Sequence, residues 1–238
     1  MSETFLDGKV RVTQPDTGFR AGLDAVMLAA AVPARPGETA LELGAGAGTA
    51  SLCLEARVPG VVVTGAEIDP WLAAMANDNA AANGMAARFF AVDAFDLPPE
   101  LKSDFDQVMC NPPFHGEGVA SPDPDRAAAL MDGGQLTDWL KLGLQRTVSN
   151  GFFTSILRAD RLAEAMAVLP DRGVTVFPLW PRAGVPAKRV ILQVRKGSRA
   201  PLLLSPGLVL HRDDGGWTDE ADAVLRCGGA LALDSRAL

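Results

Sequence analysis

The sequence predicts an α/β protein with a mostly parallel β-sheet that is covered by helices on both faces. Strand-like and helix-like stretches alternate from residue 39 to residue 169, which is the order expected of parallel strands joined by helices. The strand-like stretches are almost continuously apolar, as is typical of strands buried on both faces. The chain has 238 residues, of which 48% are hydrophobic and 21% charged, enough for one large domain with a sizeable core.

Each element follows from its own stretch of residues. Residues 4–20 predict an extended lead-in with an Asp-Gly turn, and residues 23–32 a helix that P-A-R-P-G ends. Strands are expected over residues 39–43, 61–68, 87–92, 105–110, 151–157, 174–179 and 189–195. Helices are expected over residues 49–57, 70–84, 136–148 and 161–169, with a short one from Thr218. A Pro/Gly-rich loop without a helix joins the last two strands, so one of them should be antiparallel.

Several classes of protein are disfavoured by simple counts. Cys53, Cys110 and Cys227 are odd in number and widely spaced, which fits neither a disulfide framework nor a metal cluster. His115 and His211 lie far apart, so no metal site is expected. The amino-terminal residues lack the apolar segment of a signal peptide, and the apolar runs are too short to span a bilayer. We therefore expect a cytoplasmic protein without a membrane partner.

Charge is distributed unevenly along the chain. The net formal charge is −7 and the pI about 4.9. Residues 172–212 contain eight Lys and Arg and no Asp or Glu, so this segment is +8 and the remainder −15. Such asymmetry can mark an anionic partner. Solvated strand and loop residues that balance an acidic body explain it equally well.

A glycine-rich segment, L-E-L-G-A-G-A-G-T, follows the strand expected at residues 39–43. Gly44, Gly46 and Gly48 let the backbone turn tightly and allow a ligand to approach without a Cβ in the way. The spacing is G-x-G-x-G and not the G-x-G-x-x-G of dinucleotide sites. Glu42 would repel a phosphate but suits an amino or sulfonium cation. A tight turn without a ligand is the alternative.

Acidic residues follow the next two predicted strands. Glu67 lies about 20 residues beyond the glycines, where a carboxylate can accept both hydroxyls of a ribose. Asp93 follows the third strand and can accept from an adenine amino group, or it can act only as a turn or cap residue. Asp69 is a weaker ligand candidate, because it can simply cap the helix that starts at Pro70.

The segment C-N-P-P-F-H follows the fourth strand. Two prolines end a strand, because proline lacks the N–H that a sheet requires. The Asn111 oxygen and the Pro112 carbonyl can accept both N–H groups of a planar amino nitrogen, which localises its lone pair, while Phe114 offers a stacking face. A stiff turn after the strand is the alternative.

Together these signals resemble the S-adenosylmethionine-dependent methyltransferase fold, roughly over residues 38–198. The resemblance implies a Rossmann-like, seven-stranded class I methyltransferase sheet with an antiparallel last strand. We expect residues 1–37 to form a lead-in strand and helix, residues 38–198 the donor-binding domain, and residues 199–238 a small appendage of the same domain. The implied cofactor is S-adenosyl-L-methionine, which this fold would hold through Glu42, Gly44, Ala45, Gly46, Gly48, Glu67, Ile68, Asp93, Ala94 and Asn111.

The Asn-Pro-Pro-Phe segment resembles the (D/N)-P-P-(Y/F/W) motif of methyltransferases that act on planar amino nitrogens, which implies catalytic roles for Asn111, Pro112 and Phe114. Q-P-D-T-G-F-R-A-G-L-D-A-V-M-L-A, N-P-P-F-H and P-A-K-R-V-I-L-Q-V-R-K-G are together similar to the bacterial tRNA(Val) adenine N6-methyltransferase family. That similarity implies RNA, most simply tRNA, as substrate. The expected substrate-binding residues are Pro113, Phe114, His115, Arg182, Lys188 and Arg189, and Lys196 is a further candidate for phosphate contact.

Other interpretations stay open at this stage. A protein glutamine N5-methyltransferase presents the same planar NH₂, but such enzymes resemble one another in a helical amino-terminal domain for which residues 1–37 are too short. A small-molecule methyltransferase and a non-catalytic binding module are less favoured, because Asn111 and the glycine segment are intact. The resemblance implies that Asp24 borders the donor pocket, and the alternative is an ordinary acid in the first turn of a helix. Residues 115–135 are long enough for a lid or binding loop. Monomer and homodimer are both compatible with the sequence.

Overall fold

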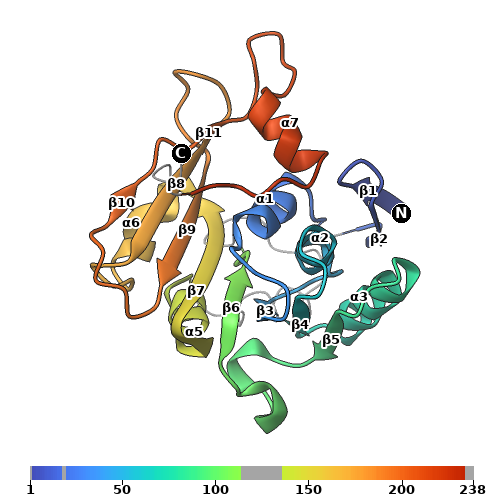
Figure 1. Ribbon diagram of the computed structural model, residues 1–238. Coiled ribbons are helices and arrows are strands. Elements are labelled where there is room, and N and C mark those ends of the chain that lie inside the picture. The colour runs from blue at the N-terminus through green and yellow to red at the C-terminus, as the bar shows by residue number, and fades with distance from the viewer. Residues whose placement is uncertain (1, 18–19, 114–135, 234–238) are drawn as a thin grey trace.

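The computed structural model describes residues 2–17, 20–113 and 136–233, which form a twisted sheet between two helical layers (Figure 1). The sheet order is β10-β8-β9-β7-β6-β3-β4-β5, and β11 pairs with β8. All pairings in it are parallel except those of β9 with β7 and β8. The seven long strands are β3 (Thr39–Leu43), β4 (Val62–Glu67), β5 (Arg88–Ala91), β6 (Phe105–Cys110), β7 (Thr147–Arg158), β8 (Val174–Trp180) and β9 (Arg189–Arg195).

The predicted fold class is therefore confirmed, including the antiparallel strand. The expected seven strands are all present, and two strands of two residues each, β10 (Leu203–Leu204) and β11 (Leu208–Val209), extend the sheet. These short strands come from the carboxyl-terminal segment, which adds to the exposed edge of β8. Covering an edge strand in this way protects its unpaired backbone groups from other chains.

Two apolar cores lie on opposite faces of the sheet. On one face pack α1 (Leu23–Ala31), α2 (Thr49–Arg57), α3 (Pro70–Ala82) and α7 (Asp219–Leu225). On the other face pack α5 (Leu136–Arg146) and α6 (Leu162–Met166). The short 3₁₀ turns η1 (Ala94–Asp96) and η2 (Pro99–Leu101) lie between β5 and β6, and η3 (Ala159–Arg161) lies between β7 and α6. Because side chains alternate along a strand, Ala40 belongs to the first core and Leu41 to the second. Within the described residues no helix combines the length and apolarity needed to cross a bilayer.

The two ends of the chain pack on the same side of the sheet. The lead-in is a hairpin, β1 (Ser2–Phe5) with β2 (Val10–Thr13), whose turn uses positive φ at Leu6, Asp7 and Gly8. Helix α7 lies beside α1, and the Leu231 N–H donates to the Ala30 carbonyl over 2.8 Å (Figure 1). Thr218 caps α7 by accepting from the Ala221 N–H, so this helix begins where the sequence predicts.

Several boundaries differ from the prediction by one to four residues, most of all the start of β7. The helix expected over residues 136–148 ends at Arg146, and β7 begins at once with Thr147, whose hydroxyl donates to the Gly143 carbonyl. Thr147 pairs with Phe105 ahead of an irregularity in the register. The apolar pattern of these residues fits a helix as well as a strand, and pairing with β6 decides in favour of the strand.

Candidate active site

The strand register brings the predicted residues to one edge of the sheet. Leu43 of β3 pairs with Cys110 of β6 on one side and with Ala66 of β4 on the other, and Glu67 pairs with Ala91 of β5. The glycine segment, Glu67, Asp93 and Asn111 therefore start at nearly the same level, on strands about 4.8 Å apart. This edge, at the carboxyl ends of the parallel strands, also contains the reversal of strand order between β3 and β6, where α/β sheets bind ligands.

The glycine segment forms a tight loop that feeds into α2. The N–H groups of Gly44 and Ala45 both donate to the Ala66 carbonyl, over 2.9 and 3.1 Å. Gly48 is the N-cap of α2, with φ +84°. A Cβ at Gly48 would come within 2.8 Å of the Phe89 ring, whereas a Cβ at Gly46 would meet nothing within 4 Å. Gly48 is thus required by packing, while the space above Gly46 is open.

Glu67 is nearly buried and fixes the loop from the neighbouring strand. One carboxylate oxygen accepts from the Gly46 N–H over 2.7 Å, and the other accepts from the Asp69 N–H over 3.0 Å. Each bond involves a charged acceptor, which makes it stronger than a bond between neutral groups. The carboxylate is therefore held at the strand end with both oxygens aimed along the loop.

Glu42 lies beneath the loop, buried against α2. One of its oxygens accepts from the N–H and the hydroxyl of Ser51, over 3.0 and 2.6 Å. Burial raises the pKa of Glu42 to about 8, although the bonds from Ser51 act in the opposite direction. In this position Glu42 supports the first turns of α2 from below.

Asp93 and Asp69 both act as N-caps, of η1 and of α3. Asp93 accepts from the Phe95 N–H over 2.9 Å at the start of η1, and Asp69 accepts from the Trp71 N–H over 2.9 Å at the start of α3. Ala94 is buried next to Asp93. Ile68, between Glu67 and Asp69, is 58% exposed, so this strand end offers an apolar surface beside a carboxylate.

Asn111 differs from Glu42, Glu67 and Asp93, because its side-chain oxygen accepts no hydrogen bond from the described residues. Its Oδ1 is buried and has no hydrogen-bond partner among the described residues. A buried acceptor without a partner costs about 1–3 kcal/mol, so such atoms call for a functional explanation. Pro112 behind it is buried and Pro113 half-buried. Phe114 and His115, predicted to contact substrate, lie outside the described residues.

The two thiols near this site are suited to packing and not to catalysis. Burial raises the pKa of Cys110, which directly precedes Asn111, and of Cys53 to about 12. A thiol with so high a pKa is not ionised near neutral pH and is a poor nucleophile. The described residues also contain no group of three or more His, Cys, Asp or Glu that could hold a metal ion.

The basic segment does not form a single surface. Arg182 and Lys188 are exposed in the β8–β9 loop, at the same edge as Asn111. Arg189 begins β9 there, and its Nε donates to the Asp24 carboxylate of α1 over 2.8 Å. Lys196 lies at the opposite edge and donates to the Thr147 carbonyl. Lys196 therefore lies apart from the others, because an antiparallel hairpin places its loop and its ends at opposite ends of the strands, and its phosphate contact stays a prediction.

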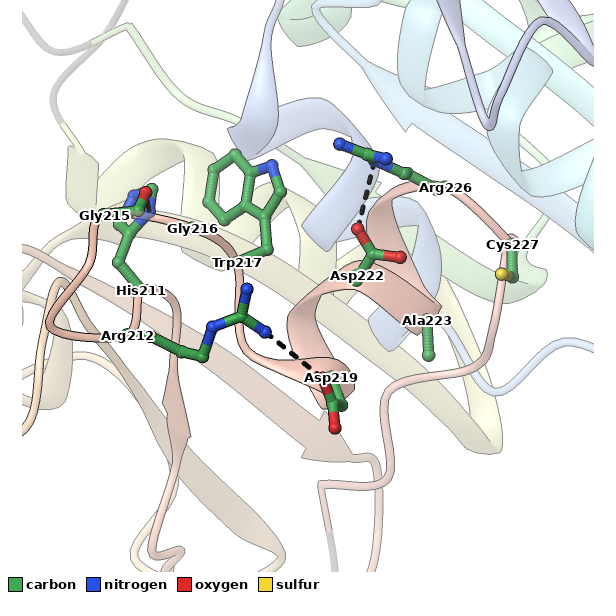
Figure 2. Close-up of a pocket in the computed structure, with 10 residues that line it drawn as sticks. All are labelled: His211, Arg212, Gly215, Gly216, Trp217, Asp219, Asp222, Ala223, Arg226 and Cys227. Carbon is green, nitrogen blue, oxygen red and sulfur yellow. Dashed lines mark hydrogen bonds and ion pairs between the residues drawn. The ribbon is translucent and has the colours of Figure 1, made fainter.

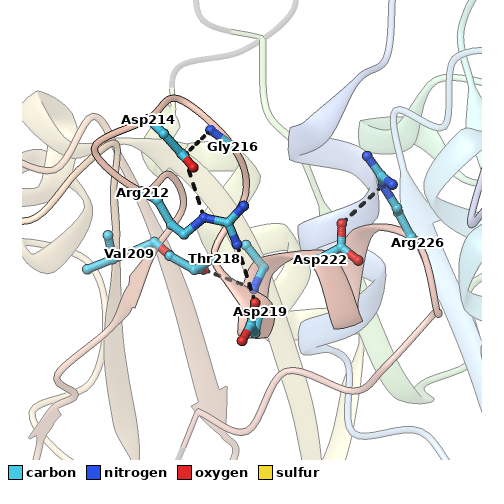
Figure 3. A network of polar contacts seen from close by, with 9 residues as sticks. Val209, Arg212, Asp214, Gly216, Thr218, Asp219, Asp222 and Arg226 are labelled. Carbon is cyan, nitrogen blue, oxygen red and sulfur yellow. Dashed lines mark hydrogen bonds and ion pairs between the residues drawn. The ribbon is translucent and has the colours of Figure 1, made fainter.

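A surface cavity of about 810 Å³ lies on the carboxyl-terminal appendage, lined by residues between His211 and Cys227 (Figure 2). His211 and Trp217 stack there with ring centroids 4.2 Å apart. Its arginines are paired: Arg212 with Asp214 and Asp219, and Arg226 with Asp222 (Figure 3). None of the predicted donor-site residues lines this cavity, so we do not place the reaction in it.

Two residues at this site were not predicted from the sequence. The ring of Trp139 in α5 packs so closely that a Cβ on Gly44 would lie 3.2 Å from it. The side-chain amide of Asn79 in α3 donates to the Ala47 carbonyl within the glycine loop, over 3.0 Å. The sequence did contain a signal for Asn79, because residues 77–83 read N-D-N-A-A-A-N. Asparagine is unfavourable inside a helix unless its side chain makes hydrogen bonds, often to main-chain atoms.

Comparisons with known proteins agree with this geometry. The family model of the methyltransferase small domain matches residues 20–135. A tRNA1(Val) (adenine(37)-N6)-methyltransferase of Aeromonas hydrophila is 26% identical over 206 residues, covering 84% of this chain and 86% of the relative. A protein of the same name from Dickeya chrysanthemi is 28% identical over 222 residues, covering 87% of each chain.

Among solved structures, a predicted O-methyltransferase of Agrobacterium tumefaciens is similar over 89% of this chain and 99% of its own, with a TM-score of 0.73 and 26% identity. The similarity therefore extends over most of this chain and nearly all of the solved protein.

Proposed function

Since this chain is an S-adenosylmethionine-dependent methyltransferase with a Rossmann-like fold, we propose that it methylates the N6 amino group of an adenine in tRNA. The cofactor supplies an electrophilic methyl group carried on a sulfonium. The chain's own residues bind the donor, orient the accepting nitrogen and hold its protons. The observation that carries the proposal is the buried, unpartnered Asn111 Oδ1 beside the glycine loop.

The donor would lie across the carboxyl edge of β3, β4 and β5. The open space above Gly46 fits a ligand that approaches the backbone closely. Glu67 and Asp93 would accept from the donor's hydroxyl and amino groups, and the exposed Ile68 would lie against its adenine ring. We assign this role to residues 38–198, with residues 1–37 and 199–238 as additions around that domain. The remaining proposed contacts are Glu42, Gly44, Ala45, Gly48 and Ala94.

Asn111 would accept one N–H of the target amino group, and the Pro112 carbonyl would accept the other. The lone pair of an exocyclic amino nitrogen is delocalised into its ring, so such a nitrogen is a poor nucleophile. Two fixed acceptors draw the lone pair back onto nitrogen and aim it at the methyl group, a preorganisation effect. No strong base is needed, because the methylated nitrogen is cationic and loses its proton readily. Phe114 would stack on the base.

RNA as the substrate is supported by the names of the Aeromonas and Dickeya relatives and by the exposed Arg182 and Lys188 at the same edge. Transfer to oxygen, which the name of the Agrobacterium protein suggests for that protein, usually requires a base or metal to ionise a hydroxyl. Two neutral acceptors facing an amino group match nitrogen better. A protein glutamine amide presents the same NH₂ group and is the alternative substrate that an experiment must separate.

The test is transfer of a tritiated methyl group from S-adenosylmethionine to undermodified total RNA and protein extract, followed by separate digestion with RNase and protease. We expect label that is lost with RNase and migrates as N6-methyladenosine after digestion to nucleosides. The Asn111→Ala variant, assayed in parallel, should give at least about a hundredfold less label. Label that survives RNase but not protease would assign the site to a glutamine amide, and label in small molecules or on oxygen would overturn the acceptor chemistry.

A further inference from the structure

Helix α3 and its C-cap contain three asparagines, Asn77, Asn79 and the C-cap Asn83, whose side-chain amides each make three hydrogen bonds to main-chain atoms. Asparagine is a weak helix former, so three of them in one helix indicate a use for the amides. Their targets differ. Asn77 bonds to Phe89 of the adjacent strand, whereas Asn79 and Asn83 bond to the lead-in strand β2.

Asn79 and Asn83 bind β2 in the same manner. The Asn79 amide accepts from the Thr13 N–H over 2.8 Å and donates to the Thr13 carbonyl over 2.9 Å. The Asn83 amide accepts from the Arg11 N–H over 2.8 Å and donates to the Arg11 carbonyl over 2.6 Å. The distance between helix residues four apart is close to that between strand residues two apart. Each amide can therefore make the pair of hydrogen bonds to one β2 residue that a neighbouring strand would make.

Asn79 and Asn83 differ in the acceptor of their third hydrogen bond. Asn83 donates to the Asn79 carbonyl within α3, over 2.7 Å. Asn79 donates to the Ala47 carbonyl, over 3.0 Å, and Ala47 stands between Gly46 and Gly48 of the glycine loop. Asn79 is buried, so this bond is shielded from water. A single side chain thus joins the lead-in hairpin to the loop.

We propose that Asn79 is a positioning residue for donor binding, which holds the glycine loop in its ligand-ready shape by tying Ala47 to Thr13. The loop contains three glycines with positive φ and would otherwise sample many conformations. Glu67 restrains it at Gly46 and Asn79 at Ala47, so less ordering is left to occur when the ligand binds. The proposal rests on the donor site described above and not on the RNA substrate.

The test compares Asn79→Ala with Asn83→Ala in the full chain. Each variant loses one pair of bonds to β2, Asn79→Ala the pair to Thr13 and Asn83→Ala the pair to Arg11. Only Asn79→Ala also loses the bond to the Ala47 carbonyl in the glycine loop. We expect the Kd for S-adenosylmethionine, measured by calorimetry without RNA, to rise about tenfold in Asn79→Ala and less than about twofold in Asn83→Ala. Equal weakening in the two variants would mean that α3 merely supports the lead-in, and an unchanged Kd in a folded Asn79→Ala protein would also overturn the proposal.

Asn79→Asp gives a second variant, since it keeps an acceptor for the Thr13 N–H but cannot donate to Ala47. It should weaken donor binding at least as much as Asn79→Ala. If neither variant folds, hydrogen exchange on the unmodified protein still decides. Coupling between sites is reciprocal, so the donor should slow exchange of the Thr13 amide about tenfold and leave the Arg11 amide nearly unchanged. A Thr13 amide that does not respond to the donor would overturn the proposal. Because no step uses RNA, this failure is distinct from a wrong substrate.

Discussion

The two halves of the site differ in how their acceptor atoms are used. In the donor half, the carboxyl groups of Glu42, Glu67 and Asp93 all accept hydrogen bonds from the protein itself. In the acceptor half, the Asn111 Oδ1 is buried with no partner among the described residues. The three carboxyl groups of the first half are thus held by internal bonds, whereas Asn111 in the second half keeps an unsatisfied acceptor for a substrate. One site can therefore contain both a rigid, internally bonded part and a part that locally lowers the stability of the fold.

The largest expected effect comes from removing the unsatisfied acceptor. Asn111→Ala should lower the rate of methyl transfer to undermodified tRNA about 10²- to 10³-fold, the loss typical of one preorganised polar group. The Tm should not fall, because the variant removes a buried acceptor that costs stability in the free protein. Steady-state kinetics and thermal unfolding measure the two quantities. A variant that unfolds several degrees earlier would show that the Asn111 amide stabilises the fold, and would contradict the idea that its oxygen is kept for a substrate at a cost in stability.

The next effect separates two glycines of the loop. Gly46→Ala should raise the Kd for S-adenosylmethionine at least about tenfold, because the added methyl group enters open space where a ligand is expected. Gly48→Ala should instead lower the Tm more strongly, since its Cβ would be forced against Phe89, and overpacking costs about 1–3 kcal/mol. Both positions have positive φ, so backbone strain is shared and serves as the internal control. Donor binding by Gly46→Ala equal to that of the unmodified protein would place the donor elsewhere.

A smaller effect concerns the two edges of the sheet. Arg182→Glu should weaken tRNA binding several-fold and reduce the slope of log K against log salt concentration by roughly 0.7–0.9, as for the loss of one phosphate contact. Arg199→Glu makes the same change of charge at the opposite edge, near Gly173, and should leave the slope unaltered. Filter binding at several salt concentrations measures both. Equal slopes in the two variants would mean that net charge, and not the site's edge, governs binding.

The sequence was sufficient to predict the main strands and helices and the end of the sheet at which the site residues lie. The strands at 39–43, 105–110 and 189–195 and the helix at 49–57 have the predicted bounds, because strongly apolar stretches are ended by residues such as Gly48 and Pro112. Register then follows from the fold class, so the strand-end residues could be predicted to lie together.

Side-chain partners could not be predicted in the same way. That Glu42 binds Ser51, and that Asn79 reaches Ala47, depends on how α2 and α3 sit on the sheet. The division of the basic segment between the two ends of the strands, by contrast, follows from the antiparallel direction of β9, which the sequence predicts. The proposed roles of Phe114 and His115 stay predictions, since these residues lie outside those described.

The last prediction concerns Glu42 in the donor half and how the free energy of unfolding depends on pH. Its pKa is raised by burial from 4.5 to about 8, so the folded protein keeps this proton between those values while the unfolded chain has lost it. The free energy of unfolding should therefore decrease as pH rises through this window, by on the order of 1 kcal/mol per pH unit, and then level off above pH 8.

Glu42→Gln removes this contribution, because the amide keeps one oxygen to accept from Ser51 and does not ionise. Denaturant unfolding at pH 5, 6.5 and 8 should give a flatter profile for the variant than for the unmodified protein, so that Glu42→Gln gains relative stability toward pH 8. Parallel profiles would mean that Glu42 is ionised throughout in the folded state. In that case the bonds from Ser51 would outweigh burial, and the donor half would hold a buried charge and not a buried proton.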